Sequence, residues 1–220
     1  MHRGGGLSDS TPESDVAESE EVYDLRAEQT PAKYILFGVV AIVFTAIDQW
    51  TKILVQRNIG PLSEEIQVIE GFLSFVHAEN PGAAFGMFGD SAYRMYFFGV
   101  FTLIALGVLG RMLYELPRDD RFQNVALGLI ASGAVGNAID RVMKQSVTDF
   151  IRVYTDNPTL KEMLIKSPYG SAEWPSFNVA DAAIVVGMLM FVIHWLFLEK
   201  EEEDGDAPAG PSAADVTPTG

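Results

Sequence analysis

Charged and amide side chains stand at short, regular spacings in the middle of this 220-residue sequence. The pairs are Asp48 with Lys52, Asn137 with Arg141, and Asn178 with Asp181. Asp140 lies within the second pair, and Asp149 lies between the second and the third. Carboxyl groups held close together cannot both ionise, so they share a proton and can serve as acid and base. Amide side chains donate and accept hydrogen bonds at once, which suits them to hold an extended peptide backbone. The set favours acid–base chemistry such as hydrolysis.

Each of these features also has a structural explanation. The first pair fits an ion pair at a helix surface. The second fits a helix end at which the arginine complements the helix dipole, and the third fits an N-cap followed by an acid in the first turn. Asp149, between apolar neighbours, fits a loop residue at a membrane surface, and the run Asn80-Pro81-Gly82 fits a tight turn. Composition alone therefore does not choose among the aspartates.

Other site chemistries have little support in the sequence. There is no cysteine, which excludes thiolate nucleophiles, zinc–thiolate sites and disulfides. The three histidines, His2, His77 and His194, do not stand at metal-ligand spacing. The common nucleotide-binding and serine-hydrolase motifs are missing. We expect neither a metal nor a cofactor.

The elements that position these residues are apolar stretches long enough to cross a bilayer, which takes about 20 helical residues. Four stretches qualify: residues 33–55, 93–114, 124–142 and 179–198. The sequence therefore predicts an all-α integral membrane protein with four transmembrane helices. In the third stretch Gly128, Ser132 and Gly136 share one helical face, the pattern that lets two helix backbones approach closely in lipid. We expect this stretch to be the central helix.

Two long segments connect these helices on one face of the membrane. In residues 56–92, the β-prone runs 66–69 and 72–76 are joined by Glu70-Gly71, which predicts a hairpin. Residues 143–178 are long and polar. The link at 115–123, on the other face, is short and charged. Seven Lys and Arg residues on the face of the termini stand against eight on the face of the long segments, so charge bias does not give the orientation.

The termini differ from the centre in composition. Residues 1–30 and 199–220 hold 15 of the 30 acidic residues but only 3 of the 15 basic ones, so the tails carry a net charge of −12 and the centre −3. Because the tails are polar and poor in large apolar groups, we predict that both are disordered. The first apolar stretch follows no basic segment, so we expect it to be retained. The predicted membrane domain is residues 31–198.

Five short motifs follow one another through the membrane domain. They are Asp48-Gln49-x-Thr51-Lys52, Asn80-x-Gly82-Ala83-Ala84-Phe85-Gly86, Gly133-x-x-Gly136-Asn137-x-x-Asp140-Arg141, Val147-x-Asp149-Phe150 and Phe177-Asn178-x-Ala180-Asp181. This series closely resembles lipoprotein signal peptidase, also called signal peptidase II. The likeness covers residues 33–198. Each motif alone is weak, whereas five in the same order are highly specific.

The resemblance implies a monomeric aspartic endopeptidase of the bacterial inner membrane, with cytoplasmic tails and a site facing the periplasm. It would remove the signal peptide from prolipoproteins, cleaving before a diacylglyceryl-modified cysteine. Its partners would be these prolipoproteins and membrane lipid, and not nucleic acid. The hairpin would be a small periplasmic element that cradles substrate. The catalytic aspartates map onto Asp149 and Asp181. The substrate-binding and site-shaping residues map onto Asp48, Lys52, Asn80, Gly133, Asn137, Arg141, Asn178 and Ala180.

Two positions depart from the family pattern. Pro81 stands where threonine is frequent, and an insert at 152–176 places Asp149 and Asp181 32 residues apart. We expect this insert to act as a lid or a substrate contact. A transporter would place polar residues near mid-bilayer, often in repeated halves, and a scaffold would need none of them. A protease of the GxGD type would need a run that Gly86-x-x-Gly89-Asp90 does not match.

Overall fold

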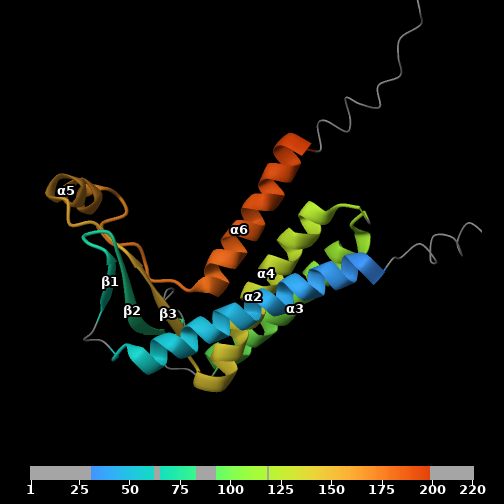
Figure 1. Cartoon of the computed structure of the whole chain (residues 1–220), viewed down its shortest axis with the longest axis horizontal. Coiled ribbons are helices and arrows are strands. Elements are labelled where there is room, and N and C mark those ends of the chain that lie inside the picture. Colours follow the sequence, from blue (N-terminus) through green and yellow to red (C-terminus); the bar gives the residue numbers. More distant parts are fainter. Residues whose placement is uncertain (1–30, 62–64, 83–92, 118, 199–220) are drawn as a thin grey trace, which may run out of the picture.

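The computed structural model describes residues 31–61, 65–82, 93–117 and 119–198. Within these residues, four helices are long and apolar enough to cross a membrane, which confirms the prediction (Figure 1). They are α2 (Pro31–Asn58), α3 (Tyr93–Glu115), α4 (Arg121–Lys144) and α6 (Val179–Ile193), which continues as a π-helical segment, His194–Leu198. The two acidic tails and residues 83–86 of the second motif lie outside the described residues.

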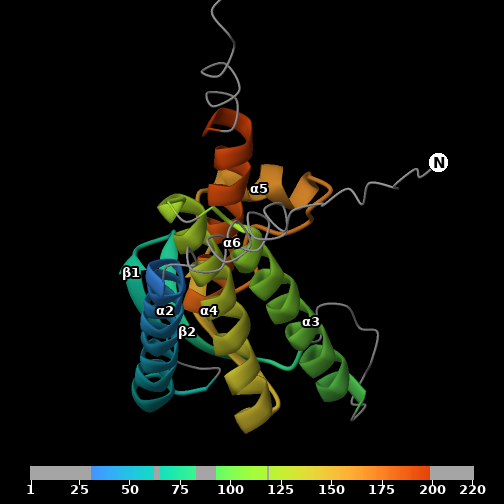
Figure 2. The ribbon, with the colours of Figure 1, turned by 90° about the vertical axis from the view of Figure 1, so that its right-hand side faces the viewer.

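Helix α4 is the centre of the bundle, as its small residues predicted. It contacts α2, α3 and α6. In its most apolar 18-residue stretch 56% of the residues are buried, against 6% in α2, 11% in α3 and 17% in α6. Figure 2 shows α4 between α2 and α3. The apolar side chains that the other helices expose are therefore lipid-facing, as expected of helices that cross a bilayer.

The small-residue face of α4 receives α2. A Cβ atom on Gly128 would stand 2.9 Å from Cβ of Val40, and one on Gly136 would stand 2.5 Å from Oδ2 of Asp48. Between them, the Ser132 carbonyl accepts a hydrogen bond from Oγ1 of Thr45 at 3.3 Å. Larger side chains here would push the two helices apart.

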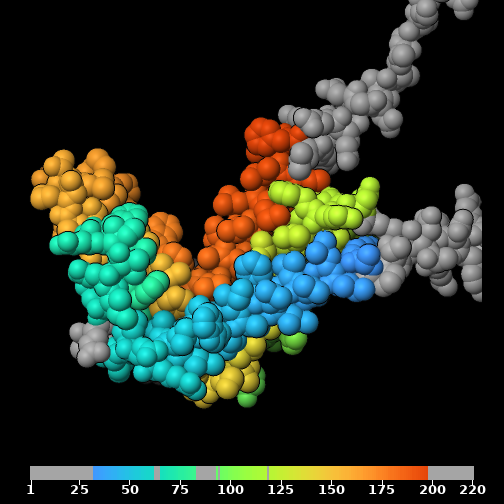
Figure 3. All heavy atoms as spheres, in the orientation of Figure 1, coloured from blue at the N-terminus to red at the C-terminus, as the bar shows by residue number. Residues whose placement is uncertain are grey.

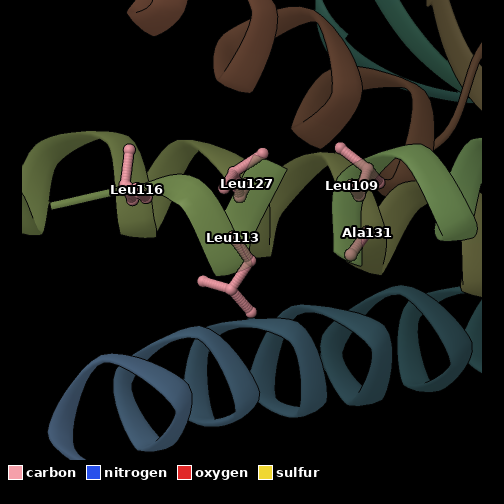
Figure 4. Close-up of a cluster of buried hydrophobic side chains, with 5 residues drawn as sticks. All are labelled: Leu109, Leu113, Leu116, Leu127 and Ala131. Atoms are coloured by element: carbon pink, nitrogen blue, oxygen red, sulfur yellow. The ribbon is translucent and has the colours of Figure 1, made fainter. Parts of the chain in front are cut away.

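Helices α3 and α4 pack through a leucine cluster toward the end of the bundle that carries the chain termini. Leu109, Leu113 and Leu116 of the α3 segment meet Leu127 and Ala131 of α4, with α2 alongside (Figure 4). The buried Lys33 of α2 donates from Nζ to the Tyr114 and Leu116 carbonyls, at 3.1 and 3.0 Å. A cation there satisfies carbonyls that the end of α3 leaves without helical partners.

At the other end lies a small antiparallel sheet with strand order β1-β2-β3. Strands β1 (Ile66–Ile69) and β2 (Leu73–Asn80) form the predicted hairpin, in which Gly71 has a φ of 72°. Strand β3 (Val147–Val153) pairs with β2, with Ala78 opposite Asp149. The local sequence did not predict β3, because its partner strand lies about 70 residues earlier in the chain.

The insert also contains a helix that sequence analysis missed, α5 (Pro158–Lys166). It begins at an Asn157 N-cap, whose Oδ1 accepts from the Leu160 amide at 3.1 Å, with proline in the first turn. We call the sheet and α5 together the arm. Figure 3 shows an open hollow between the arm and α6.

Candidate active site

Strand β3 carries Asp149 into the junction of the arm and the bundle. The residue is buried, and its Oδ2 accepts from Nδ2 of Asn80 at 3.0 Å. Asn80 is the last residue of β2, so the pairing of β2 with β3 is what brings the two side chains together. The neighbouring Phe150 packs against Val55 and Ile59 at the end of the first helix.

The start of α6 supplies the second aspartate. Asn178 caps the helix: its Oδ1 accepts from the Asp181 amide at 3.0 Å, and Asp181 Oδ2 accepts from the Asn178 amide at 3.2 Å. This is the N-cap that the spacing indicated. The same Asn178 donates from Nδ2 to Oδ1 of Asp149 at 2.8 Å. The cap and the link to Asp149 are therefore made by one side chain.

Asn137 of α4 ties this junction to the bundle. Its Nδ2 donates to Oδ1 of Asp181 at 2.8 Å. Its Oδ1 accepts from Nδ2 of Asn178 and from Nζ of Lys52, each at 3.1 Å. Both carboxyl groups thus sit in one network of amide side chains, contributed by α4, β2 and the α6 cap.

Beneath this network lies a buried group of ions. Nζ of Lys52 is 2.9 Å from Oδ2 of Asp48 and 3.1 Å from Oδ2 of Asp140, and all three side chains are at most 1% exposed. With its bond to Asn137, the ammonium uses all three of its donors. The other oxygen of Asp48 accepts from the Ala180 amide at 2.9 Å. The predicted pair therefore exists, but it is buried and fastens α2 to α4 and α6.

Gly133 on α4 lets the start of α6 approach α4 closely. A Cβ on Gly133 would stand 2.3 Å from the Ala180 carbonyl oxygen and 2.5 Å from Cγ1 of Ile184, so only glycine fits here. This contact sets how near the start of α6 lies to Asn137. Gly133 and Ala180 therefore shape the site by their small size.

Arg141, one turn beyond Asn137, lies at the polar end of an apolar groove. Its Cζ is 4.3 Å from the centre of the Phe98 ring, a cation–π contact, and Nη1 is 3.4 Å from the Asn137 carbonyl. The groove has a volume of about 520 Å³ and lies between α3, α4 and α6. Its apolar lining includes Phe101, Ile104, Val108, Ile130 and Ile184.

Comparison with known proteins shows the family of this chain. Residues 40–197 match the family model described as signal peptidase (SPase) II. The chain belongs to the signal peptidase II family. A lipoprotein signal peptidase of Maridesulfovibrio salexigens is 39% identical over 163 residues, 73% of this chain and 95% of that protein. One of Geobacter sulfurreducens is 36% identical over 169 residues, 77% of this chain and 96% of that protein.

Solved structures agree with the family assignment. A bacterial membrane enzyme determined by the in meso method at 1.9 Å resolution aligns with a TM-score of 0.58 and 29% identity, covering 72% of this chain and 91% of that one. A second, at 2.3 Å, gives 0.57 and 27%, covering 79% and 93%. This signal peptidase II is therefore a protease and a multi-pass membrane protein, as the resemblance predicted.

The electrostatics of the site distinguish Asp149. Burial raises the pKa of its carboxyl from 3.8 to about 6, the nearby charge of Asp181 adds to this rise, and the hydrogen bonds from Asn80 and Asn178 oppose it. At neutral pH such a group exchanges its proton readily. Within the described part of the chain, no group of three or more His, Asp or Glu side chains is placed to hold a metal.

Sequence analysis missed one hub of this signal peptidase II, the buried Thr148. Its amide donates to Oδ2 of Asp140 at 3.2 Å, and its hydroxyl accepts from Gln56 at 2.7 Å and donates to Glu79 at 3.1 Å. Nζ of Lys144 is 3.1 Å from Oδ1 of Asp140 and 3.3 Å from the same hydroxyl. Successive side chains of a strand point to opposite faces, so Thr148 contacts a different set of residues from Asp149. Its place next to Asp149 was the only sequence signal for this role.

Proposed function

We propose that this signal peptidase II is an aspartic endopeptidase that removes the signal peptide from prolipoproteins, cleaving before the diacylglyceryl-modified cysteine, with Asp149 and Asp181 as its catalytic pair. Relatives that are 39% and 36% identical to it over 163 and 169 aligned residues are lipoprotein signal peptidases. The observation that carries the assignment is the shared partner: Asn178 donates to Asp149 and accepts from the Asp181 amide. The two carboxyls, one buried on a strand and one half-buried at the start of a helix, are held in one polar junction.

In the proposed mechanism the pair holds one proton. Asp149, whose pKa burial raises to about 6, is assigned the proton, and Asp181, in the first turn of α6, is assigned the role of base. Asp181 takes a proton from water as the water attacks the scissile carbonyl carbon. Asp149 hydrogen-bonds the carbonyl oxygen and then supports protonation of the leaving amine.

The remaining site residues position these two. Asn137 fixes one oxygen of Asp181, and Asn80 fixes one oxygen of Asp149. Asp48 and Lys52 hold α2 against the start of α6 through the Ala180 amide. Each group is thereby held in place before substrate arrives, which lowers the cost of reaching the transition state.

The groove between α3, α4 and α6 suits an acyl chain of the lipid-modified substrate. Its walls are apolar side chains of spanning helices, and its polar end at Asn137 and Arg141 adjoins the catalytic pair. An acyl chain in this groove would bring the modified cysteine, and the peptide bond before it, to the aspartates. Arg141 is always charged and would face the glyceryl and ester oxygens.

We also propose that the tails are cytoplasmic and that the arm faces the periplasm. A cysteine introduced at Ser167, after α5, should react with a membrane-impermeant thiol reagent in intact cells. The chain has no cysteine of its own, so the labelling is unambiguous. Reaction only after permeabilisation would reverse the orientation.

The catalytic pair is tested by four single substitutions to asparagine, at Asp149, Asp181, Asp48 and Asp140. Purified variants are compared by the gel shift of a diacylated prolipoprotein. Asp149→Asn and Asp181→Asn should each abolish cleavage, because asparagine cannot transfer the proton. Both variants should still insert into the membrane, because asparagine keeps the size of aspartate and most of its hydrogen bonds. Losing one should be nearly as damaging as losing both, because residues that act as one unit are strongly non-additive.

The other two variants are the matched controls. Asp48 and Asp140 are more deeply buried than the proposed pair and lie against Lys52, so their substitution should reduce the yield of folded protein more than the turnover of what folds. Near-normal turnover in Asp149→Asn or Asp181→Asn, with dead but folded Asp48→Asn or Asp140→Asn, would show that the pair is misassigned.

A further inference from the structure

Helix α5 carries an apolar stripe that the described structure leaves largely exposed. Leu160, Met163 and Leu164 stand at i, i+3 and i+4 and so share one side, whereas the ion-paired Glu162 and Lys166 lie on the other. No residue of α5 is buried, and Leu160 and Met163 are 41% and 61% exposed. An amphipathic helix normally buries such a stripe against a core.

Two aromatic side chains in the loop after α5 are exposed as well. The rings of Tyr169 and Trp174 stack with centroids 5.8 Å apart, and they are 48% and 59% exposed. The Tyr169 hydroxyl donates to the Glu173 carbonyl at 3.1 Å, which fixes the loop that carries both rings. Tyrosine and tryptophan are enriched where a membrane meets water, because their rings are apolar and carry one polar group.

The position of the arm indicates what covers these residues. On α6, Val185, Val186, Leu189 and Val192 are each about half exposed, as suits a helix that crosses lipid. Figure 3 shows the hollow between α6 and the arm, with α5 at the far end of the arm. Lipid against the exposed face of α6 would fill this hollow, so the arm would lie over the headgroups. The stripe on α5 would then continue the lipid-facing surface of the bundle.

We propose that α5, with Tyr169 and Trp174, is an interfacial anchor that lies in the headgroup region of the bilayer and holds the arm on its surface. The proposal needs only the four spans and not the proposed catalytic pair. Its consequence is geometric: α5 follows β3 by a few residues, and β3 carries Asp149. Anchoring one end of the arm would fix the height of Asp149 above the lipid, where a lipid-linked peptide must arrive.

Site-directed spin labelling tests the placement, because single cysteines can be introduced into a cysteine-free chain. Nitroxides are attached at Met163 on the stripe, at Glu162 on the polar side, and at Leu189 as a lipid-facing reference. The full chain is placed in vesicles of phosphatidylethanolamine and phosphatidylglycerol. Collision rates with oxygen, which concentrates in lipid, and with a water-soluble nickel chelate are then compared.

The ratio of oxygen to nickel collisions should be severalfold higher at Met163 than at Glu162 and should approach that at Leu189. Equal ratios with free nickel access at both α5 positions would place the helix in water and overturn the proposal. Low access of both reagents at Met163 would show that protein covers the stripe, through a second copy or a bound peptide, and would also overturn it.

The fluorescence of Trp174 provides a second measurement. With Trp50 and Trp195 replaced by phenylalanine, Trp174 is the only tryptophan left of three. Lipids brominated near the headgroup should quench its emission strongly, and aqueous acrylamide should quench it weakly. Strong acrylamide quenching with no effect of the brominated lipids would contradict the anchor.

Discussion

Two groups of ions in this signal peptidase II each place one basic side chain between two carboxylates, but in opposite surroundings. At the junction of α2, α4 and α6, Lys52 meets Asp48 and Asp140 with every side chain at most 1% exposed. On the arm, Arg152 meets Glu65 at 2.7 Å and Glu173 at 2.8 Å with side chains 29% to 43% exposed. Buried ions must be paired and then hold their positions rigidly, whereas water screens exposed pairs. The first group can therefore hold the elements of a catalytic site in place, whereas the second contributes little to stability.

The largest expected effect is the loss of the buried cation. Lys52→Met leaves the buried Asp48 without its cation and Asp140 with only Lys144, and it should lower the free energy of unfolding by roughly 3–5 kcal/mol. The matched change on the arm, Arg152→Gln, should cost about 1 kcal/mol or less. Thermal unfolding of both variants in the same detergent measures the difference. Equal losses would mean that the two groups of ions do not differ as described.

The second prediction concerns pH and Asp149. Its pKa is raised in the fold to about 6, so the folded state favours the protonated form. The stability that this preference contributes is complete below the unfolded pKa, near 4, and is lost as pH rises through 6. A rise of about two pKa units corresponds to about 3 kcal/mol. As the pH is raised from 4 to 8, the melting temperature of the wild type should fall more than that of Asp149→Asn, which has no carboxyl at this position. Parallel curves would show that burial does not perturb this carboxyl.

A smaller effect is expected from one methyl group on α4. The Cβ of Gly133→Ala would overlap the Ala180 carbonyl, and a backbone atom cannot move aside cheaply. We expect a loss of about 1–3 kcal/mol and a drop in turnover, because the start of α6 is displaced from Asn137. Gly99→Ala on α3 is the control, since nothing lies within 4 Å of its added Cβ. A neutral Gly133→Ala would mean that the two helices can separate without disturbing the site.

The features of the fold that the sequence predicted depend on neighbouring residues, and those that it did not predict depend on distant ones or on weak local patterns. The four spans follow from runs of apolar residues, and the central place of α4 follows from Gly128, Ser132 and Gly136, because both are properties of neighbouring residues on one helix. The hairpin was predictable for the same reason. Strand β3 and helix α5 were not, because β3 is defined by pairing with a distant strand and α5 is a short helix in a polar segment.

The sequence by itself determined the local part of the site. Asn178 and Asp181 stand three residues apart, and that spacing alone specifies a helix cap in which each side chain bonds the other's amide. The motif order was enough to indicate the family. What only the tertiary structure decided is where the unused hydrogen-bonding groups of that cap point. The amide nitrogen of Asn178 reaches Asp149 because β2 pairs with β3, and Asp181 meets Asn137 because Gly133 lets α4 and α6 approach. Such contacts join residues tens of positions apart, and their geometry depends on packing across elements, which no local spacing encodes.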